Sequence, residues 1–337
     1  MPVPDDWHER QERVLAEYEQ SADKYGRPYD ELFDKLIWAE SASSWQELTG
    51  WLSELQGSWC FRGQRESGWS LRTSLDRAVR VTTSSGHYHL NRRTIERELL
   101  FRFRQQAHQF VRHIPPDDDK ASWWALMQHF GVPTRLLDWT RSPYVALYFA
   151  IEGAPKELGA SGTRNSAIWA IDLQWLKDKE KEHLGLIPDE TKARTAYLNG
   201  LLDESKKPLI VQIDPSQANE RMFAQQGFFL WKLFEDTPFF DQILISMLIH
   251  PILDRPVIRK LEIHESLRMS FLESLRSMNI HRASLFPGLD GFCESLKLDL
   301  EIQVSKEAAR RAAADNPREE TVEDLTHRSR LPALPPP

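Results

Sequence analysis

The sequence predicts an α+β fold in which a mixed or largely antiparallel sheet is flanked by helices. Short runs of apolar, β-branched and aromatic residues bounded by turn or charged residues are typical of strands. Six segments have this character: 58–64, 134–139, 167–173, 208–213, 228–233 and 257–263. Segments with apolar residues at helical spacing lie between and around them, and together the two patterns favour one layered core.

The expected helices follow from spacing and from their start and stop signals. In 44–55, Trp45, Leu48 and Leu52 share one face after a serine. Another helix starts near Trp123 and stops before Gly131, and a further one follows the pair Ser142 and Pro143. The remaining helical patterns are at 6–25, 95–111, 174–207, 265–278 and 291–300, and 82–89 reads as a polar loop.

Composition excludes several classes of protein. The chain has 337 residues, of which 41% are apolar, and a formal net charge of -7. A core of good size is therefore expected, and no global attraction to nucleic acid or to anionic membranes. The only cysteines are Cys60 and Cys293, without zinc-ligand spacing. We expect no disulfide framework, no metal site and no membrane span, which together indicate a cytoplasmic protein.

The organisation expected along the chain is one main domain with appendages at both ends. A charged helical extension covers 1–30, the main domain covers 31–302, and the tail covers 303–337. The tail is rich in Ala, Arg and Glu before it ends in LPALPPP. Such a composition buries little apolar surface, so the tail is expected to be helical and then disordered.

Charged residues stand at the ends of apolar elements in the central part of the chain. Arg62 ends the first strand, His129 ends a helix, and Arg135 and Asp138 flank a short strand. Because buried polar groups need partners, these four residues are predicted to converge on one pocket. Arg62 could present its planar fork to a phosphate or carboxylate. The alternative is a buried structural ion pair, with Asp138 as the candidate partner.

Three further polar residues follow in alternation. In an extended chain Asp138, Thr140 and Ser142 face the same way and form a polar edge. The alternative is that Ser142 caps the next helix, Thr140 bonds within the turn and Asp138 neutralises an arginine.

Later in the chain, Glu220 and Gln225 precede a strand at Gly227, where a bulge would aim a carboxylate or an amide at a site. A solvated strand entry is the alternative there. For His129 there are likewise two alternatives, a role in a site and a role in packing.

Several ordered motifs together resemble the FRG domain family, which is named for Phe-Arg-Gly. They are FRGQ at 61–64, LRTSLDR at 71–77, the run from 128 to 150, RMFAQQGFF at 221–229 and SLFPGLDG at 284–291. The resemblance covers most of residues 35–300.

The arrangement also resembles the core of ADP-ribosyltransferases at the level of fold. Arg62 and Gly63 are similar to the arginine on the first core strand of those enzymes, and Thr140 to Pro143 is similar to their Ser/Thr strand leading into a helix. The expected later glutamate is replaced by Gln225, with Glu220 nearby.

The second resemblance implies NAD as substrate. Arg62 would hold its diphosphate, and Gly63, Gln64, His129 and Arg135 are further candidates for binding the cofactor. Thr140 or Ser142 would fix the ribose. Trp139 or Tyr144 would pack the nicotinamide, and Asp138, Glu220 or Gln225 would stand where a carboxylate steadies the developing positive sugar.

Two functions remain from this reading. One is an NAD-dependent ADP-ribosyltransferase or NAD hydrolase, acting as a bacterial toxin or phage-defence (antiviral) effector on a protein or nucleic-acid acceptor. The other is a non-catalytic module that binds a nucleotide-like small molecule or a protein. The missing glutamate favours the second function.

Overall fold

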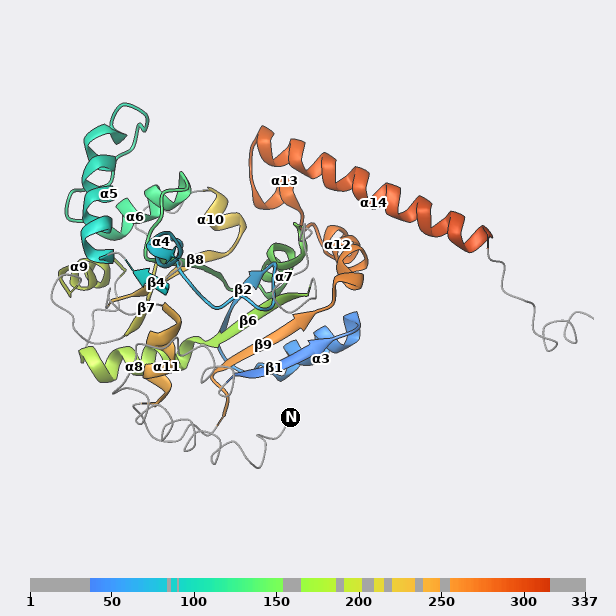
Figure 1. The fold of residues 1–337 in the computed structure, drawn as a ribbon, viewed down its shortest axis with the longest axis horizontal. Coiled ribbons are helices and arrows are strands. Elements are labelled where there is room, and N and C mark those ends of the chain that lie inside the picture. The colour runs from blue at the N-terminus through green and yellow to red at the C-terminus, as the bar shows by residue number, and fades with distance from the viewer. Residues whose placement is uncertain are drawn as a thin grey trace, which may run out of the picture.

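A seven-stranded sheet organises the protein, with strand order β1-β9-β6-β2-β5-β8-β7 (Figure 1). The computed structural model describes residues 37–83, 86–89, 91–153, 165–185, 191–201, 209–214, 220–233, 239–248 and 255–315. Only β1 and β9 pair in parallel, and all other neighbours in this sheet are antiparallel. The predicted α+β class and the mixed, mostly antiparallel sheet are therefore confirmed.

The strands of the large sheet fall close to the predicted segments, apart from the unpredicted β1. They are β1 (Trp38–Ala42), β2 (Trp59–Gln64), β5 (Leu136–Thr140), β6 (Ser166–Asp172), β7 (Ile210–Ile213), β8 (Gly227–Lys232) and β9 (Ile258–Ile263). A separate two-stranded sheet is formed by β3 (Arg80–Thr83) and β4 (Gly86–His89). The prediction of a plain polar loop at 82–89 is therefore wrong, because the chain turns back and pairs with itself there.

The sheet is nearly split between β2 and β5. These two strands are joined at a single residue pair, Phe61 with Thr140, whereas β2 pairs with β6 along its whole length. Beyond that pair the backbones of β2 and β5 no longer form a ladder. The main-chain groups on the inner edges must find other partners, which creates a natural place for polar side chains or a ligand.

Helices cover both sides of the sheet. They are α3 (Trp45–Glu54), α4 (Ser74–Ala78), α5 (Arg92–Ala107), α6 (Lys120–His129), α7 (Pro143–Ile151), α8 (Leu173–Leu184), α9 (Thr191–Leu201), α10 (Glu220–Ala224), α11 (Phe239–Leu248), α12 (Arg268–Ser277), α13 (Arg282–Leu285) and α14 (Leu289–Asp315), with a 3-10 turn at Glu265–Leu267. One core cluster joins α3, α7, α12 and the base of α14 to one face of β2, β6 and β9. A second joins α8 and α11 to the opposite face, and a third lies between α6, α9, β7 and β8.

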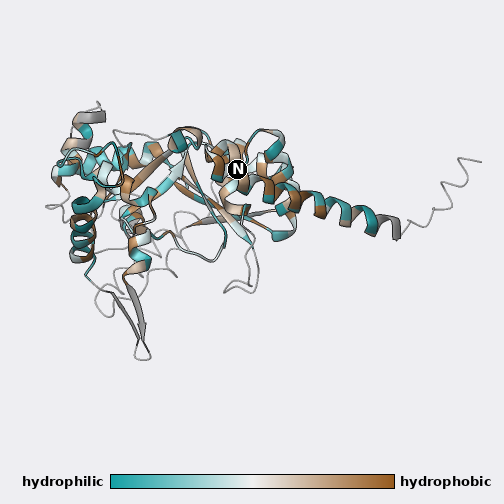
Figure 2. Ribbon diagram, turned by 90° about the horizontal axis from the view of Figure 1, so that it is seen from above, coloured by the Kyte–Doolittle hydropathy of each residue, from teal (hydrophilic) through white to brown (hydrophobic). Residues whose placement is uncertain are grey.

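The long helix α14 extends away from the rest of the described structure (Figure 2). It includes the helix predicted at 291–300 and the first part of the predicted tail. Its inner side packs through Leu298 and Ile302. Its other side exposes Leu289, Phe292, Leu296, Leu300 and Val304. The N-terminal extension at 1–30 and residues 316–337 of the tail lie outside the described residues.

Candidate functional site

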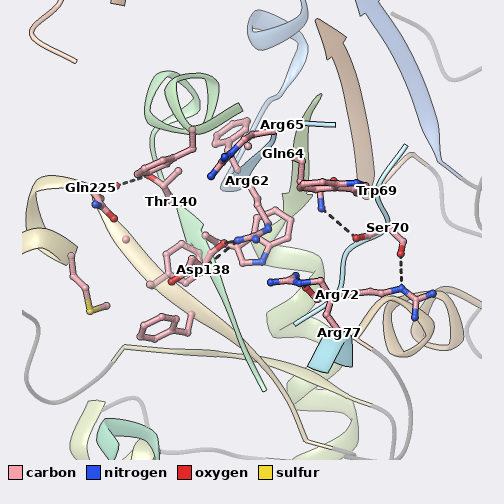
Figure 3. A pocket seen from close by; sticks show the side chains of 18 of the residues that line it. Arg62, Gln64, Arg65, Trp69, Ser70, Arg72, Arg77, Asp138, Thr140 and Gln225 are labelled. Atoms are coloured by element: carbon pink, nitrogen blue, oxygen red, sulfur yellow. Dashed lines mark hydrogen bonds and ion pairs between the residues drawn. The ribbon is translucent and has the colours of Figure 1, made fainter. Parts of the chain in front are cut away.

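A cavity of about 730 Å³ opens at the split between β2 and β5 (Figure 3). We call it the arginine cavity. Its walls are the end of β2, the loop that follows it, α4, β5, α7, α10 and the start of β8. The lining residues are Phe61, Arg62, Gly63, Gln64, Arg65, Gly68, Trp69, Ser70, Arg72, Arg77, Asp138, Trp139, Thr140, Phe149, Arg221, Met222, Gln225, Gly227, Phe228 and Phe229.

Arg62 spans the gap between the two strands. Its Nη1 donates a hydrogen bond of 2.6 Å to the backbone carbonyl of Asp138 and lies 3.9 Å from the carboxylate oxygen Oδ2 of the same residue. Its side chain is 20% exposed, and its buried Nε has no hydrogen-bond partner among the described residues. Burial lowers the pKa of Arg62, and Asp138 opposes that shift. The side chain therefore supplies a bond that the strand ladder lacks and keeps donors available for a ligand.

Four more arginines line the same cavity: Arg65, Arg72, Arg77 and Arg221. Arg72 is held by a bond of 2.8 Å from its Nε to Ser70 Oγ, and Nη1 of Arg77 donates to the Arg72 carbonyl at 2.7 Å. Asp138 is the one carboxylate among the described lining residues, and its side chain is 67% exposed. Five positive side chains against one negative charge make the cavity strongly cationic although the chain as a whole is acidic.

Arg77 lies on the short helix α4, which is held in place by a buried acidic residue. The neighbouring residue Asp76 is fully buried and accepts from Lys232 on β8, from Arg92 on α5 at 3.2 Å and from the backbone amide of Phe239 at 3.2 Å. Burial alone would raise the pKa of Asp76, but Lys232 and Arg92 outweigh it and the net shift is downward. This ion network fastens α4 to the sheet beneath the cavity.

Aromatic rings complete the walls. The lining contains Phe61, Phe149, Phe228 and Phe229, and the indole of Trp69 is 52% exposed at the rim. An exposed large aromatic side chain next to cationic groups can stack on a flat ring such as a nucleobase.

Gly63 is required by packing within the protein. A Cβ at this position would lie 2.0 Å from the carbonyl oxygen of Ala146 and 2.5 Å from the amide nitrogen of Ala150, both in the backbone of α7. The glycine lets the helix lie directly on β2. Gln64 also has internal partners, because its side chain accepts from Trp169 Nε1 at 2.6 Å and donates to the Ser70 carbonyl at 3.3 Å.

The residues at the end of β5 bond mainly to the protein. Thr140 Oγ1 donates to the Gln225 carbonyl at 2.7 Å and accepts from the Ser142 amide at 3.0 Å. Ser142 caps α7 through the Val145 amide at 3.3 Å and does not line the cavity. The side chain of Gln225 donates to the Leu285 carbonyl at 3.0 Å. Ser142 therefore caps a helix, as the alternative predicted. Thr140 bonds within the turn and also across to the Gln225 carbonyl.

His129 lies in a second cavity of about 350 Å³ that adjoins the first. We call it the histidine cavity. Its lining residues are His113, Pro115, Ser122, Ala125, Leu126, Gln128, His129, Asp138, Arg221, Met222, Gln225 and Phe229. Burial lowers the pKa of His129, and the nearby Arg221 lowers it further. Asp138 lines both cavities, so it meets Arg62 in the first and His129 in the second, whereas Arg62 and His129 share no cavity.

Arg135 does not join them, and the prediction that it lines the same pocket is wrong. Its side chain is fully buried, its guanidinium pairs with the Glu96 carboxylate, and it lies over the Trp124 ring at 4.6 Å. Arg135 stands just before β5, and α5 supplies the partner that its burial requires.

Three other predicted residues lie away from the open space of the cavities. Tyr144 stacks on Trp45 at 6.0 Å in the core cluster around α7. Trp139 touches the arginine cavity, but its side chain is 2% exposed and packs in the core. Glu220 is exposed and lines neither cavity. Neither Trp139 nor Tyr144 is therefore placed to pack a nicotinamide ring in the open part of a cavity. Of the candidate carboxylates, Asp138 is the one that lines the cavities.

Sequence reasoning did not single out Arg65, Trp69, Arg72 or Arg77, and it noted Arg221 only as a neighbour of Glu220 and Gln225. The signal for two of them was present in the motif LRTSLDR, where Thr73 and Asp76 form a capping box that starts α4. A helix start there would have placed Arg77 near the Arg-Gly strand end. Among the described residues no group of three His, Cys, Asp or Glu side chains could hold a metal ion, and no described helix is long and apolar enough to cross a membrane.

Residues 57–158 match the family model of the FRG domain. The matched segment runs from just before β2 to just after α7, and it contributes all of the arginine cavity except its wall from α10 and β8. The matched segment thus supplies both strands that flank the split. Neither the curated proteins nor the solved structures gave a match.

Proposed function

We propose that the FRG domain of this protein forms a binding site for a phosphate-bearing, nucleotide-like small molecule in the arginine cavity. The observation that carries this proposal is the excess of five arginines over one carboxylate in a concave site. Guanidinium groups match phosphate oxygens in charge and in planar geometry. The cavity volume of about 730 Å³ lies within the range typical of small-molecule sites.

The aromatic rim favours a nucleotide over a simple inorganic anion. Trp69 offers an exposed flat surface beside Arg65 and Arg72. Stacking of a base on an aromatic side chain contributes roughly 1–3 kcal/mol. A ligand that combines a flat ring with phosphates would use both kinds of surface at once.

Cleavage of NAD is the second candidate function, and the position of Asp138 favours it. Its exposed carboxylate lies in the cavity beside Arg62, where it could steady a developing positive sugar while arginines hold the diphosphate. Water or an acceptor group would bond to the ribose carbon as nicotinamide leaves, which gives nicotinamide together with free ADP-ribose or with an ADP-ribosylated protein or nucleic acid. A role as a bacterial toxin or in antiviral defence would follow from such an activity and stays a prediction here.

The test is a binding titration by calorimetry with pyrophosphate, ADP and NAD, using Arg65→Gln and Arg77→Gln. Both side chains are exposed, so the melting temperature should hold, whereas each lost charge-assisted bond should weaken ADP about tenfold or more. Arg102→Gln on α5 is the matched control, because that exposed arginine lines neither cavity. If pyrophosphate, ADP and NAD all fail to bind the parent protein, or both cavity variants bind as the parent does, the proposal is wrong.

A further inference from the structure

The two cavities adjoin each other and have five lining residues in common. Asp138, Arg221, Met222, Gln225 and Phe229 line both of them. These residues come from the middle of β5, from α10 and from the start of β8. A ligand that extends from one cavity into the other must therefore pass Asp138.

The chemistry of the two cavities differs sharply. The arginine cavity has four arginines that the histidine cavity lacks: Arg62, Arg65, Arg72 and Arg77. Apart from the shared Asp138 and Arg221, no Lys, Arg, Asp or Glu is found among the described residues that line the histidine cavity. Its own walls are amide, hydroxyl, imidazole and apolar groups from α6 and from the chain before it.

The histidine cavity also has few charged groups of its own. Burial and the nearby Arg221 lower the pKa of His129, which disfavours its charged form. An anion beyond the reach of Arg221, or a cation beyond the reach of Asp138, would lose hydration there without a charged partner. An uncharged group with hydroxyls or amides suits these walls best.

We propose that the natural ligand has two parts, a phosphate-bearing part in the arginine cavity and an uncharged, hydrogen-bonding part such as a sugar in the histidine cavity. This inference rests on the proposed nucleotide site and narrows its ligand to a nucleotide conjugate. Asp138 stands at the junction, where its exposed carboxylate can accept hydrogen bonds from hydroxyl groups of the linking segment.

The experiment compares ADP with ADP-ribose, which carries one more uncharged sugar and one fewer negative charge on its terminal phosphate. The parent protein should bind ADP-ribose roughly tenfold more tightly than ADP, which is what about two ordinary hydrogen bonds provide. Ala125→Phe narrows the histidine cavity from α6 and should abolish this preference while leaving the affinity for ADP within about twofold. Arg102→Gln, at an exposed residue that lines neither cavity, is the control and should behave like the parent.

Thermal melts accompany each titration, and Leu126→Trp serves as a second filling variant if Ala125→Phe does not fold. If the parent binds ADP and ADP-ribose equally, or if filling the cavity weakens both ligands alike, the two-part ligand is refuted while the nucleotide site stands. If neither ligand binds the parent, both proposals fail together. Loss of the preference for ADP-ribose in the filling variants alone supports the inference.

Discussion

Replacement of Gly63 by alanine should destabilise the protein strongly, because the helix α7 touches β2 at this residue. The new methyl group would lie 2.0 Å from the Ala146 carbonyl oxygen and 2.5 Å from the Ala150 amide nitrogen. Both atoms belong to backbone, so no side chain can rotate away and the helix itself must move. Overpacking of a core costs about 1–3 kcal/mol and sometimes more. We expect about 3 kcal/mol or more here, a large part of a stability of roughly 5–15 kcal/mol.

The matched control is Gly50→Ala in the exposed middle of α3, where an added Cβ meets nothing within 4 Å. That substitution should stabilise the protein by about 0.5–1 kcal/mol through helix propensity. Urea unfolding followed by circular dichroism measures both variants. If Gly63→Ala unfolds at the same urea concentration as the parent, then α7 does not rest on Gly63 as described.

Two further predictions concern the charged residues. Asp76→Asn leaves Lys232 buried without its counter-charge and should cost about 3–5 kcal/mol, whereas the double variant with Lys232→Met should recover part of this loss in thermal melts. Folding lowers the pKa of Asp76, so its charged carboxylate stabilises the folded protein above the unfolded pKa near 4. This contribution is lost as the pH falls through the pKa of the folded state. The parent should therefore lose stability in acid more steeply than the double variant, which lacks this carboxylate. Asp138→Asn should change the melting temperature little, since that side chain is exposed, but should abolish any NAD consumption; a large loss of stability would show that Asp138 mainly neutralises Arg62.

The parts of the fold that the sequence predicts well depend on local signals. The strand at 58–64, the cap at Ser142 and the helix after Pro143 follow from alternation, capping chemistry and the fixed φ of proline. The joining of the helix at 291–300 and the helical start of the tail into one continuous α14 was missed, as was the pairing of β3 with β4. Helix continuation in a charged segment and hairpin pairing both depend on contacts that a local pattern does not contain.

The same limit explains the errors at the site. Arg62 and Arg135 both stand at the end of an apolar element, and residue type alone does not tell them apart. The difference lies in Glu96, which is 39 residues away in sequence and meets Arg135 inside the core. Trp69 was missed for a similar reason, because the loop after β2 reaches the cavity only once the sheet has formed.

Arg62 differs from two other arginines of this protein in its partners, and this contrast supports an anionic ligand. In the core Arg135 pairs with Glu96, and near the sheet edge Arg259 pairs with both Glu40 and Glu54. Arg62 has only the Asp138 carboxylate, at 3.9 Å, among the lining residues, and its buried Nε has no hydrogen-bond partner among the described residues.

Clustered like charges repel, so such an arrangement persists only if the elements that carry them are held firmly. The buried carboxylate of Asp76 provides that hold for α4, through Lys232 on β8 and Arg92 on α5. The repulsion between the cations is thus overcome during folding, and a phosphate that binds in the cavity reduces it. A site prepared in this way loses less entropy when it binds, which is why the ion network beneath the cavity is expected to matter for affinity as well as for stability.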